Sequence, residues 1–349
     1  MPTGTWKSLD RGTSLPVLSK GRFTSSHIAR WCAAQENWAK IHFDEAYARD
    51  TAKLPGTLIN GALKQHLLAQ FLTEAFDGEG WVWRVDYQFT GMDLVGHALE
   101  VRGIVSDVRE NSDVVFAVVV LEIFNLDLQK TTTTGRGVVI LGKAGAAPLD
   151  AIQQSLPGEL RLNSAVESPQ GPVSDAIRAA MGTVLDKVTS HYGLDLSRLR
   201  LFADAVMDLR PIHYDPVHAA QTPYGVVVAP ALFPLHGLDL PPGTSPLSAD
   251  PMASGREGVV ELPRDLAARF GITPAGSLNG GSQIEVHSLL RIGERIAAQS
   301  KLVGVKLRTG RKGGAMLIFD TLNEFSEAGG RPLLAERHSS IYRLHDIAG

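Results

Sequence analysis

Two short stretches of the chain each place a histidine five residues after a polar side chain that can hold water. The first stretch contains Asn37 and His42, and the second contains Asp208 and His213. A histidine can transfer protons near neutral pH, and a neighbouring amide or carboxylate can hold a water molecule. Each stretch therefore predicts an acid–base site that adds water to a substrate or removes it.

The two stretches are copies of one another. The sequence at 41–44 recurs at 212–215, and the second histidine lies 171 residues after the first. The same offset relates Trp31 to Phe202. Similar sequence follows both copies: strands are expected near 98–108, 114–125 and 135–141, and again near 296–306, 315–325 and 333–342. A repeat of this length predicts an α+β fold made of two related domains.

A helix that could bind an anion is expected after the first histidine. The stretch 62–76 has apolar residues at helical spacing, and Asn60 and Gly61 precede it. Asn60 is a favourable N-cap, and Gly61 would let another group approach the first free N–H of the helix. The positive end of the helix dipole would favour an oxyanion there.

On these residues the chain resembles the MaoC-like (R)-specific enoyl-CoA hydratases and hydroxyacyl-thioester dehydratases, which have hotdog folds. The sequence from Asp208 through Pro-Ile-His213 to Asp215 matches the acid–base motif of that family. The stretch from Asn37 to Asp44, followed by Gly61, resembles a branch in which Asn replaces the Asp. The resemblance covers residues 20–141 and 180–343 and implies R stereochemistry.

The resemblance implies a double hotdog: two tandem hotdog domains, each an antiparallel sheet wrapped around a long central helix. We expect an N-terminal hotdog over residues 1–141 and a C-terminal hotdog over residues 174–349. The intervening stretch 142–173 is rich in Ala, Pro, Gly and Ser, which is typical of a linker.

One active site is expected, in the N-terminal domain. There, Asn37 and His42 would act on water and Gly61 would bind the thioester oxygen, while the second domain would shape the acyl tunnel. In the second copy the position matched to Gly61 is Pro230, which has no N–H to donate. Asp208 and His213 remain candidates for a second active site, provided that another backbone group supplies the donor.

The expected reaction is the reversible hydration of a 2-enoyl thioester to a 3-hydroxyacyl thioester, so the expected enzyme class is a hydro-lyase. Acyl-CoA is favoured over acyl-carrier protein as the substrate, and no cofactor or metal is expected. Two alternatives stay open: a noncatalytic acyl-thioester binder or partner protein, and a hotdog thioesterase that recruits Glu36 or Glu45. A His-x-Asp pair also binds Fe(II) in oxygenases, but its duplication before a long helix does not favour that class.

Composition narrows the possible partners and compartments. The formal net charge is −3 and the basic residues are scattered, so no nucleic-acid partner is expected. The single cysteine, Cys32, excludes an intrachain disulfide and suits the cytoplasm. The apolar run 114–121 is too short to cross a membrane. We expect a homodimer, and we expect Asp44 and Asp215 to cap short helices.

Overall fold

The computed structural model describes residues 9–76, 78, 80–111, 114–142, 157–244, 262–309 and 314–345. In the N-terminal half the elements are β1 (Leu18–Arg22), α1 (Ser25–Ala34), η2 (Lys40–His42), η3 (Tyr47–Thr51), α2 (Gly61–Ala75), β2 (Trp81–Phe89), β3 (Ala98–Asn111), β4 (Val114–Asn125) and β5 (Lys130–Gly142).

The C-terminal half repeats much of this order. Its elements are η4 (Gly158–Leu160), α3 (Asp175–Ala180), β6 (Val184–Thr189), α4 (Leu196–Val206), η5 (Pro211–His213), α5 (Pro216–Ala220), η6 (Phe233–Leu235), α6 (Leu266–Arg269), β7 (Gly276–Val286), β8 (Ile296–Thr309), β9 (Ala315–Glu327) and β10 (Pro332–Arg343). The α+β class is confirmed.

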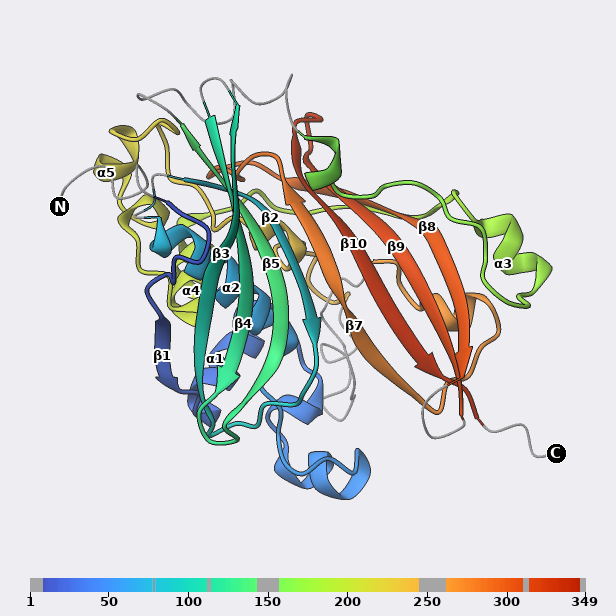
Figure 1. Ribbon diagram of the computed structural model, residues 1–349. Helices are drawn as coiled ribbons and strands as arrows, with labels where there is room; N and C mark the ends of the chain where they lie inside the picture. The colour runs from blue at the N-terminus through green and yellow to red at the C-terminus, as the bar shows by residue number, and fades with distance from the viewer. Residues whose placement is uncertain are drawn as a thin grey trace.

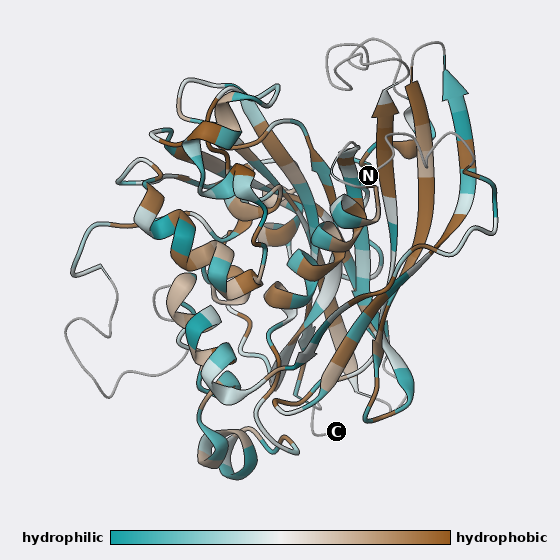
Figure 2. Ribbon diagram, turned by 90° about the vertical axis from the view of Figure 1, so that its left-hand side faces the viewer, coloured by the Kyte–Doolittle hydropathy of each residue, from teal (hydrophilic) through white to brown (hydrophobic). Residues whose placement is uncertain are grey.

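The strands of both halves form one antiparallel sheet (Figure 1). The strand order is β1-β3-β4-β5-β2-β7-β10-β9-β8-β6. The halves meet where β2 pairs with β7, from Arg84 opposite Glu285 to Tyr87 opposite Ser282. Figure 2 shows most of the helices in a layer on one side of this sheet. The seam makes the two copies parts of one continuous structure.

The sheet of the N-terminal half wraps closely around α2. Leu63, Phe71 and Leu72 are almost completely buried, and burial of each such side chain contributes about 1.5–3 kcal/mol. Strand glycines allow this approach: a Cβ at Gly103 would lie 2.6 Å from the Phe71 ring, and one at Gly137 would lie 2.5 Å from Leu72. The expected long central helix is therefore present in this half.

The C-terminal half has no comparable helix among the residues that the structure describes. Between α5 and β7 the structure describes residues 221–244 and 262–275, and the helical elements in these two ranges are η6 and α6. Pro234 is one cause of the interruption, because a proline inside a helix lacks the N–H that an α-helix needs and clashes with the preceding turn. The two copies have therefore diverged in the element that the first half uses as its core.

The segment 157–170 is attached to both halves of the sheet. On the N-terminal side, Arg84 donates from Nη1 to the carbonyl oxygen of Leu160 at 2.8 Å. On the C-terminal side, Arg337 donates from Nη2 to Oε1 of Glu167 at 2.6 Å. The segment lies within the predicted linker 142–173, of which residues 143–156 fall outside the described part of the chain. These contacts connect the two halves of the sheet through the segment 157–170.

The helices of the two halves also pack against each other. His27 of α1 contacts the Ala205 carbonyl oxygen of α4 at 2.8 Å through Nε2, and the centre of the Trp31 ring lies 5.5 Å from that of the Phe202 ring.

Of the helices in the described ranges, none has the length and hydropathy of a membrane span.

Buried histidines between the helices predict a loss of stability in mild acid. Burial lowers the pKa of His236 to about 4 and lowers the pKa of His66 well below its ordinary value. Because the unfolded chain takes up a proton below pH 6.5 and the folded chain does not, the free energy of unfolding should fall between pH 6.5 and pH 4. For His236 alone the loss should reach about 3 kcal/mol.

Urea unfolding at pH 7 and pH 4.5 tests this expectation. His236→Gln is the matched variant, because Gln65 donates from Nε2 to Nε2 of His236 at 2.6 Å and a glutamine oxygen can accept that bond. The variant should lose much of the pH dependence. An unchanged dependence would assign the acid sensitivity to other groups.

Candidate active site

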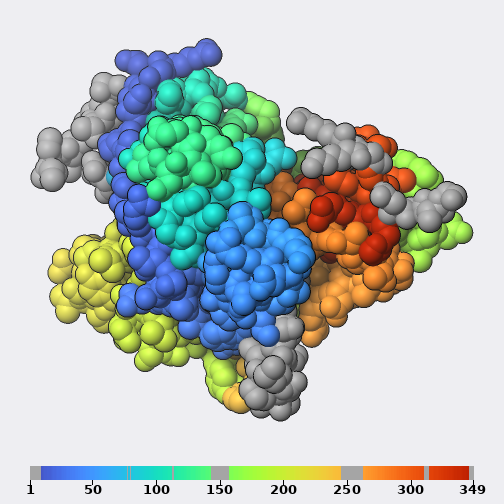
Figure 3. Space-filling model, turned by 90° about the horizontal axis from the view of Figure 1, so that it is seen from below, coloured from blue at the N-terminus to red at the C-terminus, as the bar shows by residue number. Residues whose placement is uncertain are grey.

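His42 is held in one orientation by the backbone. It ends the short helix η2, and its Nδ1 lies 2.9 Å from the Leu58 carbonyl oxygen. Because a carbonyl only accepts, Nδ1 carries the proton and Nε2 carries the lone pair. His42 is half-buried, and Figure 3 shows the surrounding mid-blue segment at the surface. The ring can therefore act as a base through Nε2.

Asn37 lies just beyond the end of α1. Its Oδ1 accepts a hydrogen bond from the Ala39 N–H at 3.1 Å, and its own N–H donates to the Cys32 carbonyl oxygen at 2.9 Å. The side-chain oxygen is thus used within the loop, and the Nδ2 group is the donor that Asn37 can offer. An amide donor can hold the oxygen of a water molecule but cannot take its proton.

Gly61 begins α2 with its backbone against an aromatic ring. A Cβ at this position would lie 2.8 Å from Cε2 and Cζ of Phe89, so any side chain would have to displace the ring. Asn60 occupies the N-cap position, but its side chain makes no cap hydrogen bond. It lies instead against the Cys32 sulfur, with Nδ2 3.8 Å from Sγ. Asn60 is therefore the N-cap residue, as predicted, but its side chain lies against Cys32 and does not bond to the helix.

The first N–H groups of an α-helix have no partner within the helix. Since the Asn60 side chain does not take them, these donors of α2 are available to an anionic oxygen. Gly61 supplies the first of them. The arrangement suits a thioester carbonyl whose oxygen gains charge during the reaction.

The second copy keeps the histidine geometry, but an arginine side chain binds to its Asp–His pair. Nδ1 of His213 lies 2.7 Å from the Val228 carbonyl oxygen, as His42 does with Leu58. Arg210 donates from Nε to Oδ1 of Asp208 at 2.8 Å and from Nη2 to Oδ2 at 2.6 Å. The same Nη2 lies 3.0 Å from Nε2 of His213. The Asp208 carboxylate and Nε2 of His213 therefore both contact the Arg210 guanidinium.

Asp208 is held in its charged form beside Arg210. Burial alone would raise the pKa of the Asp208 carboxyl, but hydrogen bonds and charge from Arg210, with His213 beside them, hold it well below its usual range. A carboxylate this stable is a poor proton acceptor. Sequence spacing could not show that Arg210 folds back onto Asp208, although Arg210 lies within the motif.

The residue matched to Gly61 needs correction. Ile59 donates its N–H to the Asp93 carbonyl oxygen at 2.8 Å, and Ala229 donates to the Leu290 carbonyl oxygen at the same distance. The equivalent positions are therefore 59 and 229, which pairs Asn60 with Pro230 and Gly61 with Ala231. The offset changes because the second copy is one residue shorter after its histidine. Ala231 has an N–H, but it begins no long helix in the described structure.

The aspartates after each histidine have the structural role that was expected. Oδ1 of Asp44 accepts from the Tyr47 N–H at 2.9 Å. Oδ1 of Asp215 accepts from the N–H groups of Val217 and His218 and caps α5.

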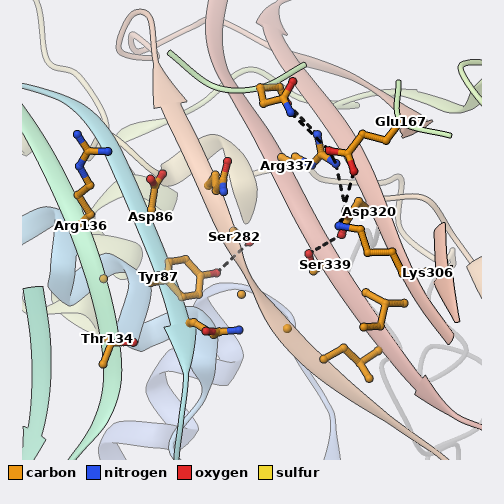
Figure 4. A pocket seen from close by; sticks show the side chains of 18 residues that line it. Asp86, Tyr87, Thr134, Arg136, Glu167, Ser282, Lys306, Asp320, Arg337 and Ser339 are labelled. Carbon is orange, nitrogen blue, oxygen red and sulfur yellow. Dashed lines mark hydrogen bonds and ion pairs between the residues drawn. The ribbon is translucent and has the colours of Figure 1, made fainter. Parts of the chain in front are cut away.

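A separate cleft of about 660 Å³ opens on the other side of the sheet. The side chain of Tyr87 points towards α2, where its hydroxyl bonds to Gln65, so the neighbouring Asp86 points the opposite way. Asp86 lines the cleft, as do Arg136, Lys306 and Arg337 (Figure 4). None of the predicted site residues Asn37, His42, Gly61, Asp208 and His213 lines this cleft.

Two family models match the two halves of the chain. Residues 10–93 match hydroxyacyl-thioester dehydratase type 2, and residues 179–336 match the FAS1-like dehydratase domain region. The first match contains Asn37, His42 and Gly61, and the second contains Asp208 and His213. A sequence search of curated proteins gives no significant match.

Solved structures support the fold. A putative MaoC domain protein dehydratase from Chloroflexus aurantiacus aligns over 99% of this chain and 98% of its own, with a TM-score of 0.63 and 11% identity. A Mycobacterium tuberculosis protein described as a double hotdog aligns over 97% of this chain and 98% of its own, with a TM-score of 0.55 and 14% identity. At these identities the likeness shows the double hotdog fold alone. Both halves thus match dehydratase models on a double hotdog fold, which indicates a hydro-lyase of the hydratase and dehydratase type.

Proposed function

We propose that the N-terminal half carries the active site of this hydro-lyase and hydrates 2-enoyl-CoA thioesters reversibly to (R)-3-hydroxyacyl-CoA. One observation carries the assignment. His42, held by the Leu58 carbonyl, is followed by the long helix α2 that begins at Gly61, whereas the described residues after His213 form no helix of that length and Nε2 of His213 lies 3.0 Å from Nη2 of Arg210. The matched dehydratase models support hydration and dehydration of thioesters, and the residues and the carrier are our proposal.

In the proposed mechanism His42 first accepts a proton and then donates it. The water oxygen, held by Asn37 Nδ2, attacks C3 of the enoyl group while His42 Nε2 takes a water proton. His42 then returns that proton to C2, so the hydroxyl forms on C3 and the double bond is saturated. The negative charge that develops on the thioester oxygen is stabilised at the Gly61 N–H and the start of α2.

Hydrogen bonds hold Glu45, one of the two candidate carboxylates of the thioesterase alternative. Glu45 accepts from Arg49 Nε at 2.6 Å and from the Thr57 N–H at 3.1 Å, and these hydrogen bonds lower its pKa. Glu45 is therefore engaged in holding the loop before α2. The hydratase reaction needs no carboxylate at this position.

The reaction can be tested with crotonyl-, octenoyl- and mesaconyl-CoA. Loss of the conjugated thioester absorbance, with a product heavier by one water, is the expected result for at least one of them. Release of free CoA thiol instead would support hydrolysis. Acyl-CoA binding without turnover would support a noncatalytic binder, and turnover only with acyl-carrier-protein thioesters would correct the carrier.

We also propose that the protein works in the cytoplasm as a homodimer of fused chains. The single buried Cys32 suits a reducing compartment, and hotdog units commonly associate through their sheets. Light scattering coupled to size exclusion distinguishes a dimer from a monomer of 37.5 kDa.

A further inference from the structure

A buried ion pair lies beside the first turn of α2. Lys64 Nζ is 2.8 Å from Oδ2 of Asp93, and the two side chains are 4% and 0% exposed. Asp93 also accepts from Asn125 Nδ2 at 2.7 Å and from Thr132 Oγ1 at 2.8 Å. The carboxylate is thus held from three sides in the interior of the N-terminal half.

This pair touches both parts of the candidate site. Nζ of Lys64 lies 4.4 Å from the centre of the Phe89 ring, and that ring is the surface against which Gly61 packs. The backbone of Asp93 accepts from the Ile59 N–H, and the next residue, Leu94, pairs with Leu58.

Leu58 in turn carries the carbonyl that orients His42. One short network therefore connects the histidine, the glycine and the start of the helix.

Stability does not explain why the chain keeps these charges. A buried ion pair loses most of its attraction to desolvation, and apolar replacements of similar size are often as stable. The second half demonstrates this within the same chain. It builds the equivalent backbone frame from Ala229 to Leu290, but the positions of Asp93 and Lys64 hold Leu290 and Pro234. The frame forms without the charges, and the described residues of the half without them include no long helix that could bind an oxyanion.

We propose that Lys64 and Asp93 are positioning residues of the acyl-thioester site. They keep Phe89 against Gly61 and keep the Leu58–Gly61 segment in register with His42. The inference deepens the proposed function and rests on it for its effect on turnover. Its effect on the position of the helix start can be measured without turnover.

The test variant is Lys64→Met/Asp93→Leu, which removes both charges together and copies the apolar residue of the second half. We expect kcat to fall about tenfold with KM changed less than threefold, because the ground-state contacts of the thioester remain while the oxyanion donor is displaced. The conservative variant Lys64→Arg keeps the charge and should retain more of kcat than the double variant.

The sole cysteine gives a readout that needs no substrate. Cys32 is buried, and its sulfur lies 3.8 Å from Nδ2 of Asn60 at the helix start. In the folded double variant, alkylation of Cys32 by N-ethylmaleimide should be at least about tenfold faster than in the parent protein, since a loosened helix start exposes the thiol.

A second buried ion pair supplies the matched control. Arg337 and Asp320 are 8% and 5% exposed and lie 3.1 Å apart in the C-terminal half. Arg337→Met/Asp320→Leu should change neither kcat nor the rate of Cys32 alkylation. Each protein is measured at the same number of degrees below its own melting temperature. Unchanged alkylation and kcat in the folded Lys64/Asp93 variant would overturn the proposal. If the parent protein hydrates no thioester, the proposed function fails, and Cys32 alkylation alone decides the positioning role.

Discussion

Replacing His42 with alanine is expected to lower kcat by about a thousandfold in a protein that still folds, because the reaction loses its only proton carrier. The same change at His213 is expected to reduce kcat less than threefold. Nε2 of His213 already faces Arg210, so this ring has no role in the proposed reaction. The measurement is the initial rate of hydration of whichever enoyl thioester gives the highest parent activity.

The two histidine variants control for each other. Each loses one bond to a backbone carbonyl, from Nδ1 to Leu58 in one case and to Val228 in the other, which costs about 1–3 kcal/mol. His213→Ala also loses a buried ring and its contact with Arg210, so its loss in stability should be the larger one although its loss of activity is the smaller. Equal losses of activity from both replacements would show that the single-site assignment is wrong and that Asp208 and His213 also act.

Gly61→Ala is expected to lower kcat/KM by about a hundredfold, the size of effect seen when an oxyanion donor is lost. The new Cβ would lie 2.8 Å from the Phe89 ring, and it would also stand beside the N–H that the thioester oxygen must reach. Packing and catalysis are thus both affected by the single change, and steady-state kinetics alone would not separate them.

A second variant separates the two effects. Gly61→Ala/Phe89→Leu removes most of the overlap with the ring, so its melting temperature should recover towards that of Phe89→Leu alone. The activity should stay low if Gly61 is needed for the approach of the thioester. Recovery of activity together with stability would reduce Gly61 to a packing residue.

The sequence predicted the duplication because the motif Ile-His-aromatic-Asp occurs twice, after similar upstream residues. It could not predict the register beyond that motif. The second copy is one residue shorter between His213 and Val228, so the partner of Gly61 is Ala231, whereas the match to Pro230 had assumed a loss of two residues. A loop can lose a residue without changing the hydrogen bonds at its ends, so the sequence did not fix the length of the gap.

The side-chain partners of the site were also beyond sequence reasoning. The pattern around Asp208 predicted an acid–base pair, and the chemistry of the pair depends on Arg210, whose direction is a property of the folded loop. Asn60 has the right type and position for a cap, yet Cys32 holds its side chain. Lys64 and its partner Asp93 are 29 residues apart, so the spacing of residues in the sequence does not pair them.

The seam between β2 and β7 has a kinetic consequence for the assembly of the two halves. Because both strands belong to one chain, their meeting is an intramolecular event at a local concentration that the connecting segment sets, and dilution cannot oppose it. Two separate hotdog subunits would have to find each other by diffusion and would part at low abundance. Here each newly made chain carries its own partner, so the pairing of the halves belongs to folding and not to a binding equilibrium.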